Sequence, residues 1–147
     1  MRPLRNVCVV LACASLLLGQ FGCGTTGSLL SSTQFSDSAY NTDKRLKTDS
    51  LALIDQAKNK APYNSVAEDV NGLMNKIDET IATEQKRTKN APTVAQWKKI
   101  KAQLTSLFNM WKTKGTLSPA FADDARTQVS SLFDILINTE NDKRAGS

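Results

Sequence analysis

Apolar residues recur with the period of an α-helix along much of the chain. In the clearest stretch they are three or four residues apart, which places them on one helix face. Pro92 precedes this stretch, and Thr93 and Gln96 have the spacing of a capping box. Gly115 follows it as a typical C-terminal stop. We predict a helix over residues 93–114 with a buried face of Trp97, Ile100, Leu104, Leu107 and Trp111.

Two more helices follow from the same spacing. Ser65 and Glu68 form a second capping-box pattern and predict a helix over residues 65–86. Ser118 as N-cap and Pro119 at the first helical position predict another, ending near Thr139. The apolar faces are Val66, Val70, Leu73, Ile77 and Ile81 in the first of these, and Ala122, Ala125, Val129, Leu132, Phe133 and Leu136 in the second.

A fourth helix is expected over residues 37–60, with a weaker pattern. Ser50 interrupts its apolar stripe, and its first half is mostly polar. We expect the second half to pack and the first half to project or fray. The stripe consists of Leu46, Leu53, Ile54 and Ala57.

These helices predict an all-α protein, because no useful stretch alternates with the period of a strand. Short connections make consecutive helices antiparallel, so residues 37–140 are expected to form an up-down four-helix bundle. A three-helix bundle with a loosely docked first helix is the alternative. Residues 141–147 are expected to form a disordered tail.

The first 22 residues have the composition of a secretory signal peptide. Arg2 and Arg5 supply its positive start, and residues 7–18 are small or apolar without interruption. A membrane-spanning helix needs about 20 apolar residues, so this run is too short to span. We therefore predict that residues 1–22 are removed on export.

Gly22 and Cys23, placed directly after this run, resemble the processing site of a bacterial lipoprotein precursor, although Gln20 stands where that family usually has Leu. The resemblance implies that Cys23 is acylated and becomes the first residue of the mature chain. Gly24 follows it, which in that family implies sorting to the outer membrane, facing the periplasm. Two alternatives are processing at Cys13, and ordinary cleavage that releases a soluble periplasmic or secreted protein.

Composition after the predicted cleavage site agrees with an exported, tethered domain. Cys23 would be the one cysteine left, so no internal disulfide could form. Residues 24–36 are rich in Gly, Ser and Thr, and with Cys23 they are predicted to form a flexible tether over 23–36. Loss of the leader lowers the formal charge from +5 to about +3. Nucleic acid is not an expected partner of an exported chain.

The residue types give no support to catalysis. The chain has no His, which removes the commonest general base near neutral pH and the commonest transition-metal ligand. Adjacent carboxylates on a helix point about 100° apart, so pairs such as Asp78 and Glu79 are expected to be solvated. We predict no catalytic site, no metal site and no cofactor.

Charge is segregated in the second half of the chain. Residues 85–114 contain eight basic residues and no acidic one. The candidate binding strip is Lys86, Arg87, Lys89, Lys98, Lys99 and Lys101. This strip could bind anionic lipid or a cell-wall polymer. We favour the simpler interpretation, in which it balances the charge of acidic neighbouring helices.

From these observations we expect a non-catalytic envelope lipoprotein. Its lipid would hold it to the membrane, and its bundle would bind a protein partner as an adaptor, assembly factor or inhibitor. Binding of anionic lipid or polymer through the basic strip is the alternative, and an enzyme of unknown type is a remote third.

Overall fold

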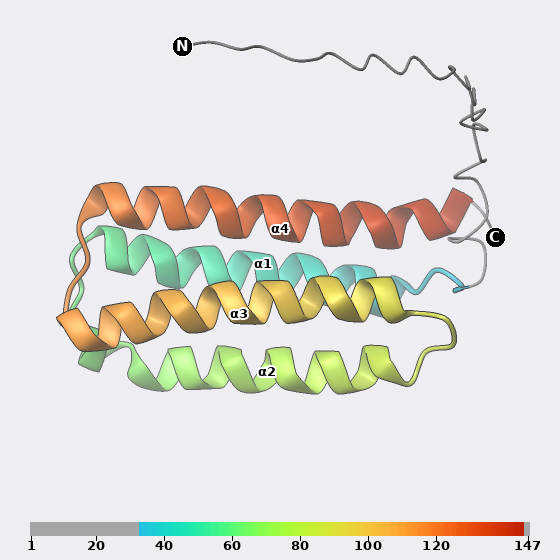
Figure 1. The fold of residues 1–147 in the computed structure, drawn as a ribbon, viewed down its shortest axis with the longest axis horizontal. Helices are drawn as coiled ribbons and strands as arrows, with labels where there is room; N and C mark the ends of the chain where they lie inside the picture. Colours follow the sequence, from blue (N-terminus) through green and yellow to red (C-terminus); the bar gives the residue numbers. More distant parts are fainter. Residues whose placement is uncertain (1–32, 146–147) are drawn as a thin grey trace, which may run out of the picture.

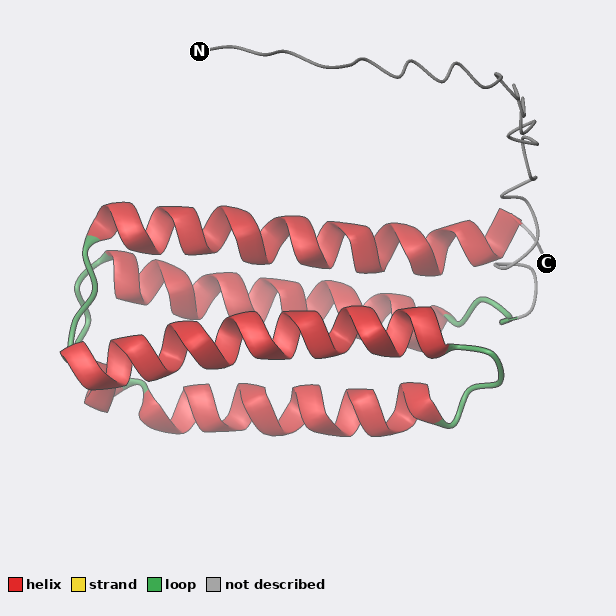
Figure 2. Cartoon of the chain, in the orientation of Figure 1, coloured by secondary structure: helices red, strands yellow, loops and turns green. Residues whose placement is uncertain are grey.

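The computed structural model describes residues 33–145, and strands are absent from this part of the chain. Four α-helices account for most of it: α1 (Asp37–Lys58), α2 (Ala67–Gln85), α3 (Ala91–Lys114) and α4 (Pro119–Ala145). A short 3-10 helix, η1 (Tyr63–Ser65), lies between α1 and α2. Figure 2 shows the helices joined by short loops. The predicted all-α fold is confirmed.

Consecutive helices run antiparallel, as the short connections require (Figure 1). Helix α1 packs against α2 and α4, and α3 packs against the same two helices, so the four close into a bundle. Contacts between α1 and α4 are the most extensive, whereas those between α1 and α2 are sparse. The first half of α1 is also packed, because Ala39 and Asp43 are buried. The alternative with a loosely docked first helix is therefore wrong.

The two tryptophans anchor the core, as their place in the apolar pattern predicts. Both are fully buried. Trp97 meets Phe133 of α4 edge-on at 5.6 Å between ring centroids, and Trp111 meets Tyr63 of η1 at 5.8 Å. The Trp111 indole N–H also donates to the Ala61 carbonyl at 3.0 Å, which ties α3 to the loop after α1.

Two predicted capping boxes are absent. Ser65 lies in η1 and donates its hydroxyl to the Pro62 carbonyl, so α2 begins two residues later, at Ala67. Helix α3 begins at Ala91, with Pro92 inside its first turn, where a missing N–H removes no helical bond. Thr93 is consequently already inside the helix, and its side chain is buried.

Other predicted helix ends are correct. Gly115 ends α3 with φ of 75°, a value that strains residues with a side chain. Ser118 caps α4 by accepting from the Phe121 N–H at 3.3 Å, and Pro119 is the first helical residue. Helix α1 is capped by Ser36, which accepts from the Ala39 N–H at 3.2 Å.

The end of α4 differs from the prediction. The helix continues past Thr139 to Ala145, so residues 141–145 of the expected disordered tail are helical. The physical reason is that Glu140 and Lys143 are buried and bonded to Arg87 and Asn90 in the loop between α2 and α3. Polar contacts at this end extend the helix beyond Leu136, its last buried apolar residue.

Candidate functional site

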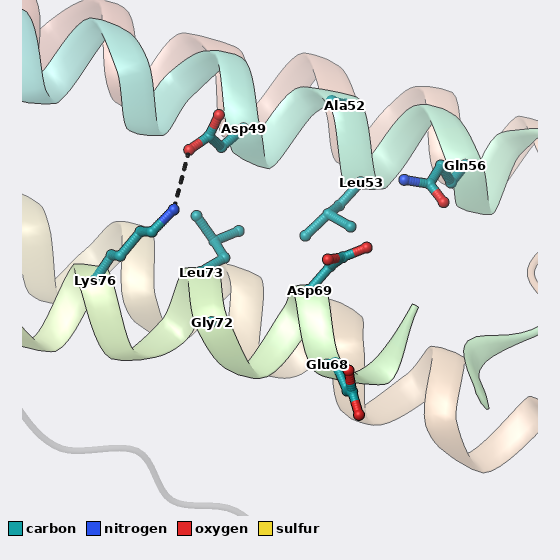
Figure 3. A pocket seen from close by; sticks show the side chains of 9 residues that line it. All are labelled: Asp49, Ala52, Leu53, Gln56, Glu68, Asp69, Gly72, Leu73 and Lys76. Atoms are coloured by element: carbon teal, nitrogen blue, oxygen red, sulfur yellow. Dashed lines mark ion pairs between the residues drawn. The ribbon is translucent and has the colours of Figure 1, made fainter. Parts of the chain in front are cut away.

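A groove separates α1 from α2 in the half of the bundle away from residue 33 (Figure 3). Its volume is about 330 Å³. It begins at Asp49, about 18 Å along α1 from Asp37 at a rise of 1.5 Å per residue. The lining residues are Asp49, Ala52, Leu53 and Gln56 of α1, and Glu68, Asp69, Gly72, Leu73 and Lys76 of α2.

Small residues open this groove. Ala52 on α1 and Gly72 on α2 line it, with the largely buried side chains of Leu53 and Leu73 beside them. A Cβ atom added at Gly72 would meet no atom within 4 Å. Glycine inside a helix costs about 1 kcal/mol relative to alanine. Packing within the described chain does not require a glycine at this position.

The rim of the groove is acidic. Glu68 and Asp69 are exposed and form no ion pair with any residue between 33 and 145. Asp69 points across the groove toward α1 in Figure 3. Asp49 is 3.9 Å from the ammonium of Lys76, which is the one basic residue of the lining. The groove thus combines net negative charge with a narrow floor of small residues over the largely buried Leu53 and Leu73.

A buried polar network lies at the opposite end, where α1 begins and α4 ends. Glu140 is fully buried, and its carboxylate accepts from Nη2 and Nη1 of Arg87, at 2.8 and 3.2 Å, and from the Lys143 ammonium. Arg87 also donates to buried Glu84 at 2.8 Å. Asn90 donates to the same Glu84 oxygen at 2.5 Å.

Lys143 closes the network from the last turn of α4. Its ammonium donates to the Asn90 side-chain oxygen at 2.9 Å and to the Thr93 hydroxyl at 3.1 Å, besides its contact with Glu140. Hydrogen bonds from Arg87 and Lys143 hold the pKa of Glu140 below its usual range against the opposing effect of burial. Glu140 therefore remains charged inside the bundle.

Asp43 of α1 faces this network but forms no ion pair with any residue between 33 and 145. Its side chain is 1% exposed, and one of its carboxyl oxygens has no hydrogen-bond partner among residues 33–145. Burial, followed by the nearby Glu84 and Glu140 charges, raises the pKa of Asp43 to about 8. A protonated Asp43 leaves two carboxylates facing two cations, so the buried cluster is electrically neutral.

The segment that precedes α1 is fastened to the same network. The Ser36 N–H donates to Glu140 at 2.9 Å, and Arg87 donates to the Gln34 carbonyl at 2.6 Å. The Phe35 ring packs on Tyr40 and lies 4.1 Å from the Arg144 guanidinium. Residues 33–36, which composition assigns to a flexible tether, are thus docked on the bundle. Cys23 and the predicted signal peptide lie outside the described residues.

The six residues of the candidate basic strip do not form one surface. Arg87 is largely enclosed by the network, and Lys101 is 2.5 Å from Asp78 of α2 in an exposed ion pair. The Lys101 pair agrees with the charge-balance interpretation. The other four side chains are exposed, namely those of Lys86, Lys89, Lys98 and Lys99.

The apolar pattern of the helices does not predict the network, although the sequence contains a sign of it. Asp43 precedes Leu46 by three residues, Glu84 follows Ile81 by three, and Glu140 follows Leu136 by four. Each carboxylate therefore continues an apolar face in helical register. Polar residues at such positions near one bundle end indicate a buried polar layer.

The fold and these surfaces define a small antiparallel four-helix bundle. Among residues 33–145, no group of three or more His, Cys, Asp or Glu side chains is placed to hold a metal ion. No helix in that range is long and apolar enough to cross a bilayer. The chain matches no protein-family model, no curated protein and no solved structure with which it was compared.

Proposed function

We propose that this protein is an exported, lipid-anchored adaptor that binds a protein partner in the groove between α1 and α2 and performs no catalysis. The observation that carries the proposal is the open, acidic groove beside Gly72. A helix-interior glycine with free space around it lowers stability without improving packing inside the chain. A segment of another protein pressed against α2 would make use of that space.

Charge suggests the kind of segment that binds. Glu68 and Asp69 on the rim favour basic side chains, while exposed Ala52, beside the largely buried Leu53 and Leu73, favours an apolar one. We therefore propose that the occupant is a basic, amphipathic segment of an envelope protein. A helix that lays its apolar face into such a groove is a common mode of peptide recognition.

The lipid anchor is proposed on the residues Gly22 and Cys23 and on the apolar run before them. In cells fed radiolabelled palmitate, the wild-type protein should incorporate label and a Cys23→Ser variant should not. Equal labelling of the two proteins, or no labelling of either, would remove the anchor from the proposal. Binding in the groove would then be tested on its own.

Site-specific photo-crosslinking tests the groove. A benzoylphenylalanine placed at Gln56, on the groove, should give one major adduct in intact cells, whereas the same group at Gln128, exposed on α4, should not. Gly72→Leu fills open space and should abolish the Gln56 adduct. Asn71→Leu adds the same side chain at an exposed position of α2 outside the groove lining, and should leave the adduct intact.

Two results would overturn the groove proposal. One is an adduct at Gln56 that survives Gly72→Leu unchanged. The other is the same adduct from both crosslinker positions, which would indicate nonspecific proximity. Purification of the Gln56 adduct and mass spectrometry would then identify the partner segment, which should be basic and amphipathic.

A further inference from the structure

The turn between α2 and α3 carries an exposed basic surface that the groove does not use. Lys86, Lys89 and Lys98 are exposed, and none forms an ion pair with another residue between 33 and 145. Lys89 and Lys98 line a hollow of about 440 Å³ together with the apolar residues Ala91, Val94 and Ala95. Lys86 lines a second hollow, which shares Arg87 with the first. We name the surface formed by Lys86, Lys89, Lys98 and the first hollow the tether-end face.

Hydrogen bonds place the N-terminal segment directly on this turn. The Thr33 hydroxyl donates to the backbone carbonyls of Thr88 and Lys89, at 3.0 and 2.9 Å. Cys23 precedes Thr33 by ten residues, and even a fully extended chain of that length spans at most about 36 Å. Helix α4 alone, with 27 residues, is about 40 Å long. A lipid on Cys23 would therefore keep the tether-end face near the membrane.

Acidic side chains at this end do not offset the exposed lysines. Glu84 and Glu140 are buried and bonded to Arg87 and Lys143. Asp37 is 3.2 Å from Arg144 in an exposed ion pair, and Asp142 is exposed on α4. The lysines around the α2–α3 turn thus have no acidic partner on the bundle surface beside them.

We infer that the tether-end face binds the anionic phospholipid headgroups of the membrane that holds the lipid anchor. The three lysine ammonium groups would contact headgroup phosphates, and the apolar hollow would rest against the interface. The bundle would then stand with its acidic groove directed away from the bilayer, where a partner can reach it. This inference rests on the proposed anchor for its geometry.

Fluorescence on reconstituted, processed protein tests the inference. A cysteine introduced at Ala95, which lines the hollow, is labelled with nitrobenzoxadiazole. Thr116→Cys, in the loop after the far end of α3, serves as the distant position. The vesicles contain a quencher on the lipid headgroup. With phosphatidylglycerol present, the Ala95 label should be quenched much more strongly than the Thr116 label. In pure phosphatidylcholine the difference should largely disappear.

Charge reversal at the two ends of α3 supplies a control. The triple variant Lys86→Glu, Lys89→Glu, Lys98→Glu should lose the phosphatidylglycerol-dependent quenching. The double variant Lys112→Glu, Lys114→Glu, at the distal end of α3, should keep it. Quenching should also fall as salt rises from 50 to 500 mM, because salt screens exposed charges. Equal effects of the two variants, or quenching without anionic lipid, would overturn the inference.

The fate of the anchor is measured separately, by mass spectrometry of the same preparation. If Cys23 carries no lipid, the anchor proposal fails while the headgroup inference is still tested by flotation with phosphatidylglycerol vesicles. Each lysine near an anionic surface contributes roughly fivefold in partitioning, so the triple variant should reduce flotation on the order of 100-fold or more. Flotation that is unchanged in the triple variant would overturn the inference.

Discussion

Replacing Asp43 by asparagine removes the one carboxyl of the polar network that lacks a cation of its own. Asparagine has nearly the shape of a protonated aspartic acid and stays neutral at every pH. In the wild-type protein Asp43 ionises with a pKa of about 8, and ionisation would leave an unbalanced negative charge beside Glu84 and Glu140. The substitution should therefore change the pH dependence of stability more than stability at low pH.

The sign follows from proton linkage. The folded protein holds the Asp43 proton up to about pH 8, whereas the unfolded chain releases it near 3.8. The stabilisation from the Asp43 proton is therefore complete below pH 3.8. It decreases steadily as the pH rises from 3.8 and is lost once the pH has passed 8. The slope in this window is about 1.4 kcal/mol per pH unit, so the loss between pH 5 and 8 is at most about 4 kcal/mol. Water entry on ionisation would reduce it.

Urea unfolding followed by circular dichroism at pH 5, 6, 7, 8 and 9 measures the effect. The free energy of unfolding of Asp43→Asn, relative to wild type, should increase by several kcal/mol from pH 5 to pH 8 and then level off. Other titrating groups are common to both proteins and cancel in this difference. Asp124→Asn, at an exposed carboxylate of α4, should show a nearly constant difference. A constant difference for Asp43→Asn as well would refute the assignment of a buried, protonated carboxyl.

Three further predictions concern stability and burial. Arg87→Met leaves two buried carboxylates without their shared cation and should lower the free energy of unfolding in urea by about 3–5 kcal/mol. Lys101→Met breaks an exposed ion pair and should lower it by less than about 1 kcal/mol. Equal losses in the two variants would contradict the network. In thermal melts, Gly72→Ala should stabilise by about 0.5–1 kcal/mol, and Gly115→Ala should destabilise by about 1 kcal/mol because of its φ of 75°. Both tryptophans are fully buried, so iodide should quench their fluorescence weakly in the folded protein and strongly in urea. Strong quenching before unfolding would contradict their burial in the core.

The apolar pattern was sufficient to predict the bundle, because its signal depends on residues that must leave water. Trp97, Ile100, Leu104 and Trp111 are spaced to share a helix face, and all four are fully buried. Helix ends were harder to predict. The Ser65 and Thr93 caps were wrong because their backbone neighbourhoods are set by the η1 turn and by Pro92, which local residue spacing does not reveal.

The groove and the network could not be predicted from residue type alone. Glu84 and Lys143 are ordinary surface residues by composition. Their pairs with Arg87 and Glu140 are local, three residues apart, but only tertiary packing joins Arg87 to Glu140 and Lys143 to Asn90 and so makes one buried network. The groove depends on how closely α1 and α2 approach, which a single amphipathic pattern does not fix. Gly72 was visible in the sequence, but its meaning needed the empty space around it.

The position of the network suggests why a polar layer is useful at this end of the bundle. Within residues 33–145, the loop between α2 and α3 is the one connection between helices at this end, where α1 begins and α4 ends (Figure 1). Hydrogen bonds of Gln34 with Arg87 and of Ser36 with Glu140 hold the incoming chain to the α2–α3 loop and to α4. If the protein is anchored through Cys23 as proposed, tension from the membrane enters through these bonds and is shared with neighbouring helices. An apolar layer would be less suited to this load, because hydrophobic contacts are non-directional and do not fix one residue to a particular partner.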